Sequence, residues 1–264
     1  MRERREKPQG HARGRWRWLW GKHAVEEAVR GGGRKIRELW ILHKSEGAQI
    51  ADLVRMAREV GAKVRWVSRA ELDRVSQSGA HQGFAVMTDE RAAKGIDELL
   101  DSLTDADKQS LVLVALDQIQ DPHNLGAIAR SAVCLGAKAL LLTERNSVHV
   151  TPAAVQASAG AIERIPVYNV GNLSQTLAQL KERGLWIYGA DMSGKPAWEV
   201  RLNAPMVLVI GSEGSGIRRL VGDVCDEIVR IPQAAQGVAS LNASCAASVL
   251  LYEIARQLNA PAGT

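Results

Sequence analysis

Three short stretches in the second half of the chain combine small, amide and hydroxyl residues in a way that suits a nucleoside-like ligand. They are DPHNLGAIARSA (Asp121–Ala132), VIGSEGSGI (Val209–Ile217) and IPQAAQGVASLNAS (Ile231–Ser244). Backbone N–H and C=O groups can approach a ligand closely where side chains are small. The charged member of the second stretch, Glu213, would repel phosphate but could orient a ribose hydroxyl or a cation.

The second stretch does not match the two common nucleotide-binding loops. GSEGSG at residues 211–216 is not G-x-G-x-x-G, and it follows a late strand rather than the first strand of its sheet. It also lacks the Gly-Lys-Ser/Thr ending of a phosphate-binding P-loop. A nucleotide-dependent oxidoreductase is therefore the least favoured enzyme class, because no fingerprint follows the strand that ends at Leu116.

The elements that would position these stretches alternate between strands and helices. Apolar runs predict strands over residues 111–116, 139–142, 165–168, 185–190, 206–210 and 227–231. Helical spacing predicts helices over residues 125–135, 152–159, 173–183, 217–221 and 240–258. This order predicts an α/β fold with a parallel sheet covered by helices on both faces. Ligands of such sheets bind at the carboxyl ends of the strands, so the three stretches should meet at one edge.

A smaller α/β unit precedes this sheet. We expect a basic disordered arm over residues 1–15, a first α/β domain over 16–88, a linker with one short helix over 89–110, and a second α/β domain over 111–264. In the first domain the pattern predicts helices over residues 21–30, 50–60 and 69–76, and strands over 36–42, 63–67 and 83–87. Trp16, Trp18 and Trp20 either anchor the start of this domain or stack on bases, and anchoring is the favoured role.

Charge and composition limit the partners. Residues 1–22 hold eight Lys and Arg against two Glu, so the net charge of +5 comes from the N-terminal arm. Such an arm suits a phosphate backbone, although it could equally be a solvated tail. No apolar run approaches the ~20 residues of a membrane helix, and there is no signal-peptide pattern, so we expect a cytoplasmic protein without a membrane partner. Three Cys without C-x-x-C spacing argue against a disulfide framework or a metal site.

The three stretches, in this order, resemble the SpoU (TrmH-type) family of RNA 2′-O-methyltransferases. The matching patterns are D-P-x-N-x-G-x-x-x-R-(S/T)-A, G-x-E-G-x-G and S-L-N-x-S before a final helix, and together they cover residues 111–258. In the first unit, G-x-H-A-V-x-E-A at 21–28 and HQG at 81–83 resemble the ribosomal-protein-like substrate-binding domain of the RlmB type. That subgroup methylates a guanosine of 23S rRNA.

The resemblance implies a trefoil-knotted (SPOUT) parallel-sheet domain, S-adenosylmethionine as cofactor, 23S rRNA as partner and a homodimer. It also implies roles for eight residues of this chain. The catalytic candidates are Arg130, Asn124, Glu213, Ser240 and Asn242. The cofactor-binding candidates, whose backbone would surround the methyl donor, are Gly211, Ile231 and Leu241.

We expect Arg130 to orient the ribose hydroxyl and to take part in removing its proton, aided by the adjacent RNA phosphate. A guanidinium pKa above ~12 makes literal deprotonation costly, and a ribose hydroxyl is too weak an acid for an ordinary carboxylate base. Glu213, Asn124 and Asn242 would fix the geometry of Arg130 and the ribose. Two histidines, His23 and His81, are expected to be structural or to contact RNA rather than to act as bases.

Several alternatives stay open from the sequence. Asn124, Asn242 and Glu213 could each cap a helix, and Arg130 could form a surface ion pair. The segment 233–237 is one residue longer than the family pattern, which bears on donor affinity. The substrate could be tRNA or another rRNA site, or the chain could be an inactive RNA-binding member of the family.

Overall fold

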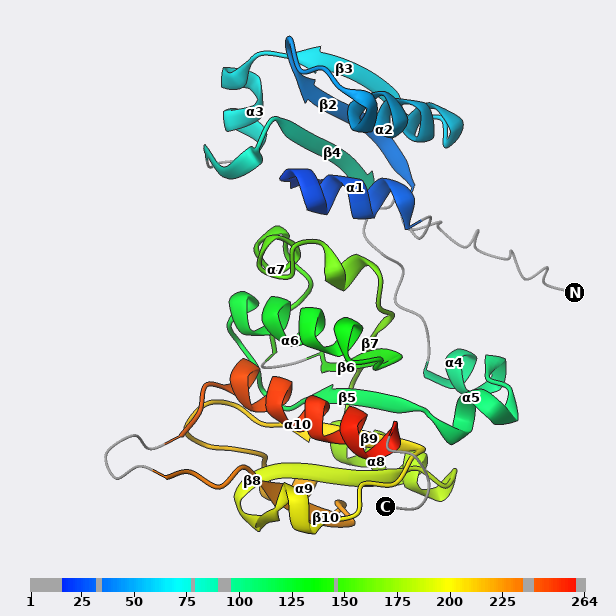
Figure 1. Cartoon of the computed structure of the whole chain (residues 1–264), viewed down its shortest axis with the longest axis vertical. Helices are drawn as coiled ribbons and strands as arrows, with labels where there is room; N and C mark the ends of the chain where they lie inside the picture. The colour runs from blue at the N-terminus through cyan, green and yellow to red at the C-terminus, as the bar shows by residue number, and fades with distance from the viewer. Residues whose placement is uncertain are drawn as a thin grey trace, which may run out of the picture.

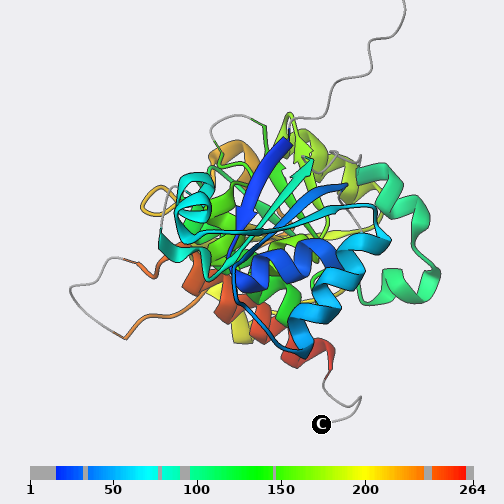
Figure 2. The same cartoon turned by 90° about the horizontal axis from the view of Figure 1, so that it is seen from above.

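The computed structural model describes residues 16–31, 35–76, 79–89, 96–144, 147–234 and 240–259. These residues form two α/β units, with the first lying over the second (Figures 1 and 2). The expected basic arm, residues 1–15, lies outside the described residues. Within the described ranges, no helix combines the length and the apolar character needed to cross a bilayer.

The first unit is a four-stranded sheet with helices on both faces. Its elements are β1 (Trp16–Trp20), α1 (Lys22–Arg30), β2 (Ile36–Leu42), α2 (Ala48–Glu59), β3 (Lys63–Val67), α3 (Arg69–Ser76), η1 (Gly79–His81) and β4 (Phe84–Asp89). The strand order is β1-β4-β2-β3, and only the β2–β3 pair is parallel. The three tryptophans near the start form β1, a strand that the sequence pattern did not predict. Trp18 packs against Trp40 with ring centroids 4.5 Å apart, which agrees with an anchoring role.

The segment between the units holds two helices where one was expected. These are α4 (Ile96–Ser102) and α5 (Asp105–Gln109). The second helix has a capping box, in which Thr104 and Asp107 exchange side-chain and backbone hydrogen bonds. Leu100 of α4 is buried in the apolar cluster on one face of the second sheet, so this segment packs on the second unit.

The second unit is a six-stranded parallel sheet. Its elements are β5 (Val112–Leu116), α6 (Pro122–Cys134), β6 (Ala139–Thr143), α7 (Pro152–Ala157), η2 (Ala161–Glu163), β7 (Val167–Val170), α8 (Leu173–Glu182), β8 (Trp186–Pro196), η3 (Ala197–Glu199), β9 (Met206–Ile210), α9 (Arg219–Gly222), β10 (Glu227–Arg230) and α10 (Ala243–Leu258). Buried side chains of α6, α7 and α10 share one apolar cluster with one face of the sheet, and those of α8 and α9 share a second cluster with the other face. The expectation of a parallel sheet covered on both faces is confirmed.

The strand order places a topological switch at the centre of this sheet. The order is β10-β8-β9-β5-β6-β7, so the chain builds outward from β5 through β7, then crosses to β8 and returns to β9 beside β5. The loops after β5 and β9 therefore open side by side, which is where open parallel sheets bind ligands. The backbone N–H of Asp117 donates to Ile210 O at 2.8 Å and joins the two strand ends.

Candidate active site

The three motifs meet through three polar side chains at the carboxyl edge of the second sheet. Asn124 Nδ2, on the first turn of α6, donates to Glu213 Oε1 at 2.7 Å. Asn242 Nδ2 donates to Asn124 Oδ1 at 3.0 Å and also to Glu213 Oε1. Each member of this Asn124–Glu213–Asn242 cluster comes from a different motif, so segments far apart in sequence converge on one carboxylate.

The helix caps separate structural from site roles. Asp121, not Asn124, caps α6, because its side chain accepts from the backbone N–H of His123 at 2.9 Å. Asn242 does cap α10, since its Oδ1 accepts from the backbone N–H of Ser244 at 2.9 Å, and its Nδ2 remains available for the cluster. The Glu213 carboxylate accepts hydrogen bonds from the side-chain amides of Asn124 and Asn242.

A cavity of about 360 Å³ lies on one side of the cluster, between the ends of β8, β9 and β10 and the start of α10. All three candidates for donor binding, Gly211, Ile231 and Leu241, line it, and so do Ser240 and Glu213. Apolar residues from four elements complete its walls; they include Ile210, Val229, Ala246 and Leu250.

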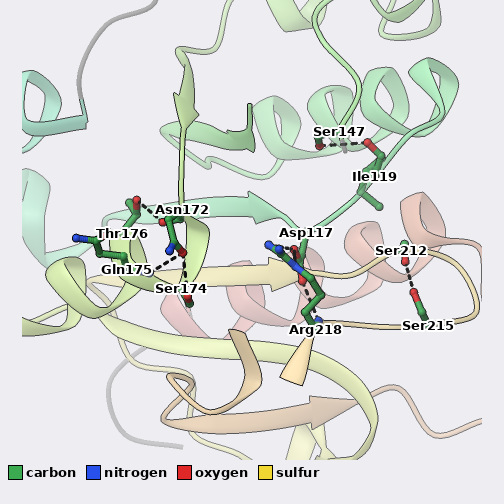
Figure 3. Close-up of polar contacts among 10 residues, drawn as sticks. All are labelled: Asp117, Ile119, Ser147, Asn172, Ser174, Gln175, Thr176, Ser212, Ser215 and Arg218. Carbon is green, nitrogen blue, oxygen red and sulfur yellow. Dashed lines mark hydrogen bonds and ion pairs between the residues drawn. The ribbon is translucent and has the colours of Figure 1, made fainter. Parts of the chain in front are cut away.

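The loop from Gly211 to Gly216 requires glycine at its two ends. A Cβ built on Gly211 would lie 2.1 Å from the backbone carbon of Gly216, so no larger residue fits without moving the chain. Gly216 has a φ of +64°, a conformation that side-chain-bearing residues rarely adopt. The loop closes through mutual backbone hydrogen bonds between Ser212 and Gly216, and the Ser212 and Ser215 hydroxyls lie 2.5 Å apart (Figure 3).

A second, more polar cavity of about 350 Å³ lies against the same cluster. Residues 118–121 and Asn124 line it from the β5–α6 side, and Ser212, Glu213 and Ser215 line it from the β9 side. Glu213 lines both cavities. The cluster therefore stands between a largely apolar cavity and a polar one.

A buried ion pair that the sequence did not single out supports this edge (Figure 3). Asp117 is fully buried at the end of β5, and its Oδ1 accepts from Arg218 Nε at 2.7 Å. Its Oδ2 accepts from the backbone N–H of Arg218 at 2.8 Å. The pair fastens the segment after the glycine loop to β5. The feature of the sequence that could have indicated this pair is the position of Asp117, a carboxylate directly after a wholly apolar strand.

Arg130 is not brought to the cluster within one chain. It lies on α6 six residues after Asn124, is exposed, and lines neither cavity. Among the described residues it makes no hydrogen bond and no ion pair, so the expected alternative of a surface ion pair is not seen either. In the segment 233–237, which is longer than the family pattern, Gln233 lines the larger cavity. Residues 235–239 lie outside the described part of the chain.

The remaining titratable candidates have structural roles or open surroundings. His81 is buried, with Nδ1 accepting from the backbone N–H of Gly83 at 2.9 Å, so it holds a turn. His23 is exposed at the start of α1. Burial raises the pKa of the Cys225 thiol to about 12, so it stays protonated at neutral pH and cannot serve as a nucleophile there. The described residues contain no group of three or more His, Cys, Asp or Glu that could hold a metal ion.

Comparison with known proteins identifies the family. Residues 111–252 match the sequence model of the SpoU rRNA Methylase family, and residues 18–93 match that for RNA 2′-O ribose methyltransferase substrate binding. The chain belongs to the SpoU rRNA methylase family. It is accordingly an RNA 2′-O-methyltransferase, and the methyl donor of this family is S-adenosylmethionine.

Relatives of this SpoU enzyme span nearly its whole length. A putative TrmH family tRNA/rRNA methyltransferase, YacO of Bacillus subtilis, is 38% identical over 90% of this chain and 95% of its own. The 23S rRNA (guanosine-2′-O-)-methyltransferase RlmB of Shewanella oneidensis is 36% identical over 90% of this chain and 96% of its own. The recognition of a SpoU enzyme similar to the RlmB type is confirmed.

Solved structures show the same fold. A putative RNA methyltransferase of the TrmH family from Porphyromonas gingivalis aligns with a TM-score of 0.72 at 27% identity, covering 92% of this chain and 90% of that one. AviRb from Streptomyces viridochromogenes, solved in complex with AdoMet, aligns with a TM-score of 0.77 at 24% identity over the same shares. The two-unit architecture therefore recurs in solved members of the family.

Proposed function

We propose that this enzyme transfers the methyl group of S-adenosylmethionine to the ribose 2′-hydroxyl of a guanosine in 23S rRNA. The observation that carries the proposal is the Asn124–Glu213–Asn242 cluster, which stands between an apolar and a polar cavity. Relatives named as 23S rRNA guanosine enzymes, 35–36% identical over about nine-tenths of the chain, support the choice of RNA and base.

The larger cavity fits the methyl donor. Its volume of about 360 Å³ is within the ~300–1,000 Å³ range of small-molecule sites. Apolar side chains can cover an adenine, and Gly211, Ile231 and Leu241, which line the cavity, can hydrogen-bond through their backbone to its edge or to the sugar. S-adenosylmethionine, when bound, supplies an electrophilic methyl group on its sulfonium. A Cβ at Gly211 would have no space, which accounts for a glycine there.

The polar cavity fits the acceptor ribose. Glu213 Oε1 accepts from both asparagines, while Oε2 accepts no hydrogen bond among the described residues and can receive one from a ribose hydroxyl. Ser240, on the rim of the donor cavity, can hydrogen-bond to the ribose or the donor. Holding the two reacting groups in contact accounts for a large part of the rate in such transfers.

Arg130 is proposed to orient the 2′-hydroxyl and to assist removal of its proton from within a homodimer. Its neighbour Ser131 lies with Oγ 2.7 Å from Ser248 Oγ, so Arg130 sits beside the seam between α6 and α10. Val249 and Tyr252 are exposed on α10 at 45% and 62%. A partner subunit docked on this face would cover the apolar side chains and bring Arg130 of one subunit toward the site of the other.

The remaining features of the proposal concern architecture. We propose that residues 16–88 form a ribosomal-protein-like RNA-binding domain, that 89–110 connect it, and that 111–264 form a trefoil-knotted domain. The knot is proposed from the family match over residues 111–252. We place the reaction in the cytoplasm, where an rRNA substrate is available.

Mapping of 2′-O-methylation across rRNA and tRNA, from cells with and without the gene, tests the target. We expect one guanosine of 23S rRNA to lose its methyl group. If a tRNA position loses its methyl group instead, the substrate is tRNA and not 23S rRNA. The name of YacO, a tRNA/rRNA methyltransferase, also allows this substrate. In the purified enzyme, Arg130→Ala and Arg130→Lys should lose turnover while S-adenosylmethionine binding, measured by calorimetry, is retained. Full turnover in Arg130→Ala would refute the role of Arg130.

A further inference from the structure

We infer that the groove between the two units binds one unpaired nucleobase of the RNA, flanking the methylated nucleotide. The inference rests on the proposed function. The groove has a volume of about 390 Å³. Its walls are the β1–α1 turn with His23 and the neighbouring Gln82 from the first unit, and His123 with the end of α7 from the second.

Contacts between the units fix the width of this groove. Arg164 Nε of the second unit lies 3.3 Å from Glu27 Oε2 on α1. A Cβ built on Gly160 would lie 2.9 Å from His23 O, so the backbones of the two units approach closely beside the groove. The groove is therefore formed before RNA arrives, and a preformed site loses less free energy to ordering.

The HQG motif builds one wall. The buried His81 accepts from the backbone N–H of Gly83 and so closes a turn in which Gln82 has a φ of +52°. Gln82 Oε1 accepts from the backbone N–H of Lys22 at 3.0 Å, which fixes the direction of the amide. Gln82 Nε2 donates no hydrogen bond among the described residues. The histidine of the motif is thus structural, and the glutamine is displayed at the groove.

The lining has the chemistry of a nucleobase site. Gln82 carries an amide whose Nε2 can donate to the acceptor edge of a base. His23 and His123 are exposed imidazoles on which a base can stack. None of the described residues that line the groove carries a carboxylate, so these walls do not repel the phosphates of an approaching strand.

The position of the groove specifies which base it would take. His123 lines the groove, and Asn124, the next residue of α6, belongs to the cluster and to the polar cavity. An RNA strand whose ribose occupies the polar cavity therefore passes His123 to reach the groove. A base flanking the methylated nucleotide, rather than the base of that nucleotide itself, is within this reach.

Base-specific chemical footprinting of a 23S rRNA transcript, with reagents that modify base edges, tests the inference independently of methyl transfer. We expect the wild-type enzyme to protect one base within two nucleotides of the methylated ribose. Gln82→Ala and His123→Ala should lose that protection and keep the others. Gln49→Ala is the matched control, because Gln49 is an exposed glutamine of the same unit that lines a different hollow and should leave the footprint unchanged. Thermal unfolding of each variant checks that the fold is retained.

An abasic nucleotide at the protected position completes a thermodynamic cycle. It should weaken binding to the wild-type enzyme about tenfold, within the range for loss of one stacked or paired base, and should weaken binding to Gln82→Ala by a smaller factor, because only the stacking contacts remain to be lost there. Footprints of both variants identical to the wild type, or full additivity in the cycle, would overturn the inference. If protection depends on Gln82 while no rRNA guanosine is methylated, the inference that the groove binds a base is supported and the proposed function is refuted.

Discussion

Asn124 on α6 donates a 2.7 Å hydrogen bond to Glu213, which lies 89 positions later in the chain, in the loop after β9. This bond joins the segments that follow β5 and β9, the two strands at which the sheet order reverses. Because Asn242 donates to the same carboxylate oxygen, Glu213 is held by two amides from two helices. The carboxylate is therefore oriented before any substrate binds.

The first prediction concerns the charge of this cluster. Asn124→Asp replaces the donating amide by a second carboxylate next to Glu213, so the two side chains should repel each other and move apart. We expect kcat to fall about 10- to 100-fold, because small displacements of positioning groups have effects of that size. S-adenosylmethionine affinity should change little. Methyl incorporation into rRNA and calorimetry measure the two quantities.

Asn172→Ala is the control for that substitution. Asn172 caps α8 through its contact with the backbone N–H of Gln175, away from both cavities (Figure 3). Its loss should cost about 1 kcal/mol of stability and leave kcat unchanged. An Asn124→Asp enzyme with wild-type kcat would show that the cluster does not position the ribose.

The second prediction separates space from backbone strain in the glycine loop. Gly211→Ala places a Cβ 2.1 Å from the backbone of Gly216, so we expect S-adenosylmethionine affinity to fall more than about 100-fold. Gly214 has a φ of +85° but open space around its Cβ position. Gly214→Ala should therefore cost only the ~1–2 kcal/mol of a left-handed residue and weaken the donor about tenfold at most.

Gly136→Ala provides the comparison for strain alone. Gly136 follows α6, has the same φ of +85°, has nothing within 4 Å of its Cβ position, and lines neither of the site's cavities. It should lose stability as Gly214→Ala does and bind the donor normally. Equal donor affinities for Gly211→Ala and Gly136→Ala would remove the steric argument.

The sequence predicted the elements better than the connections between them. Strand 206–210 was placed correctly because MVLVI is an apolar run that ends at Gly211. Strands 36–42 and 63–67 were also placed correctly, although charged residues interrupt both. The first strand was missed, since alternating Trp and Arg at Trp16–Trp20 fits an anchor or a stacking surface as well as a strand. Strand β8 runs to Pro196, six residues beyond its apolar run, because pairing with β10 continues it where its own side chains become polar.

The site was predicted as a set of residues, and the structure added their geometry. The motifs indicated Asn124, Glu213 and Asn242. No spacing in the sequence could show that both asparagines donate to the same oxygen atom of Glu213. Arg130 illustrates the limit, because its motif position gives no hint that it is exposed and lines neither cavity within one chain. The Asp117–Arg218 pair was missed because its partners lie 101 positions apart and belong to no pattern.

The third prediction concerns that buried pair. Arg218→Ala leaves Asp117 fully buried without its guanidinium, so we expect a loss of about 3 kcal/mol, near the lower end for breaking such a pair because Arg218 is itself half-exposed. Adding Asp117→Asn should recover part of this loss, since a neutral amide needs no counter-charge. Urea unfolding measures both. Arg55→Ala, which breaks an exposed pair with Glu59 on α2, should leave the free energy of unfolding almost unchanged.

The last prediction concerns the exposed face of α6 and α10. Tyr252→Asp puts a charge on the most exposed apolar side chain of α10, at 62%. If a second subunit covers this face, the charge is desolvated on association, so the variant should be a monomer in sedimentation experiments and should lose turnover with Arg130 displaced from the partner's site. Leu220→Asp tests a comparably exposed position, at 64%, on α9 of the opposite face, and should keep the wild-type assembly. A dimer that survives Tyr252→Asp together with Val249→Asp would exclude this face as the interface, and full activity of a monomeric variant would exclude a partner's contribution to the site.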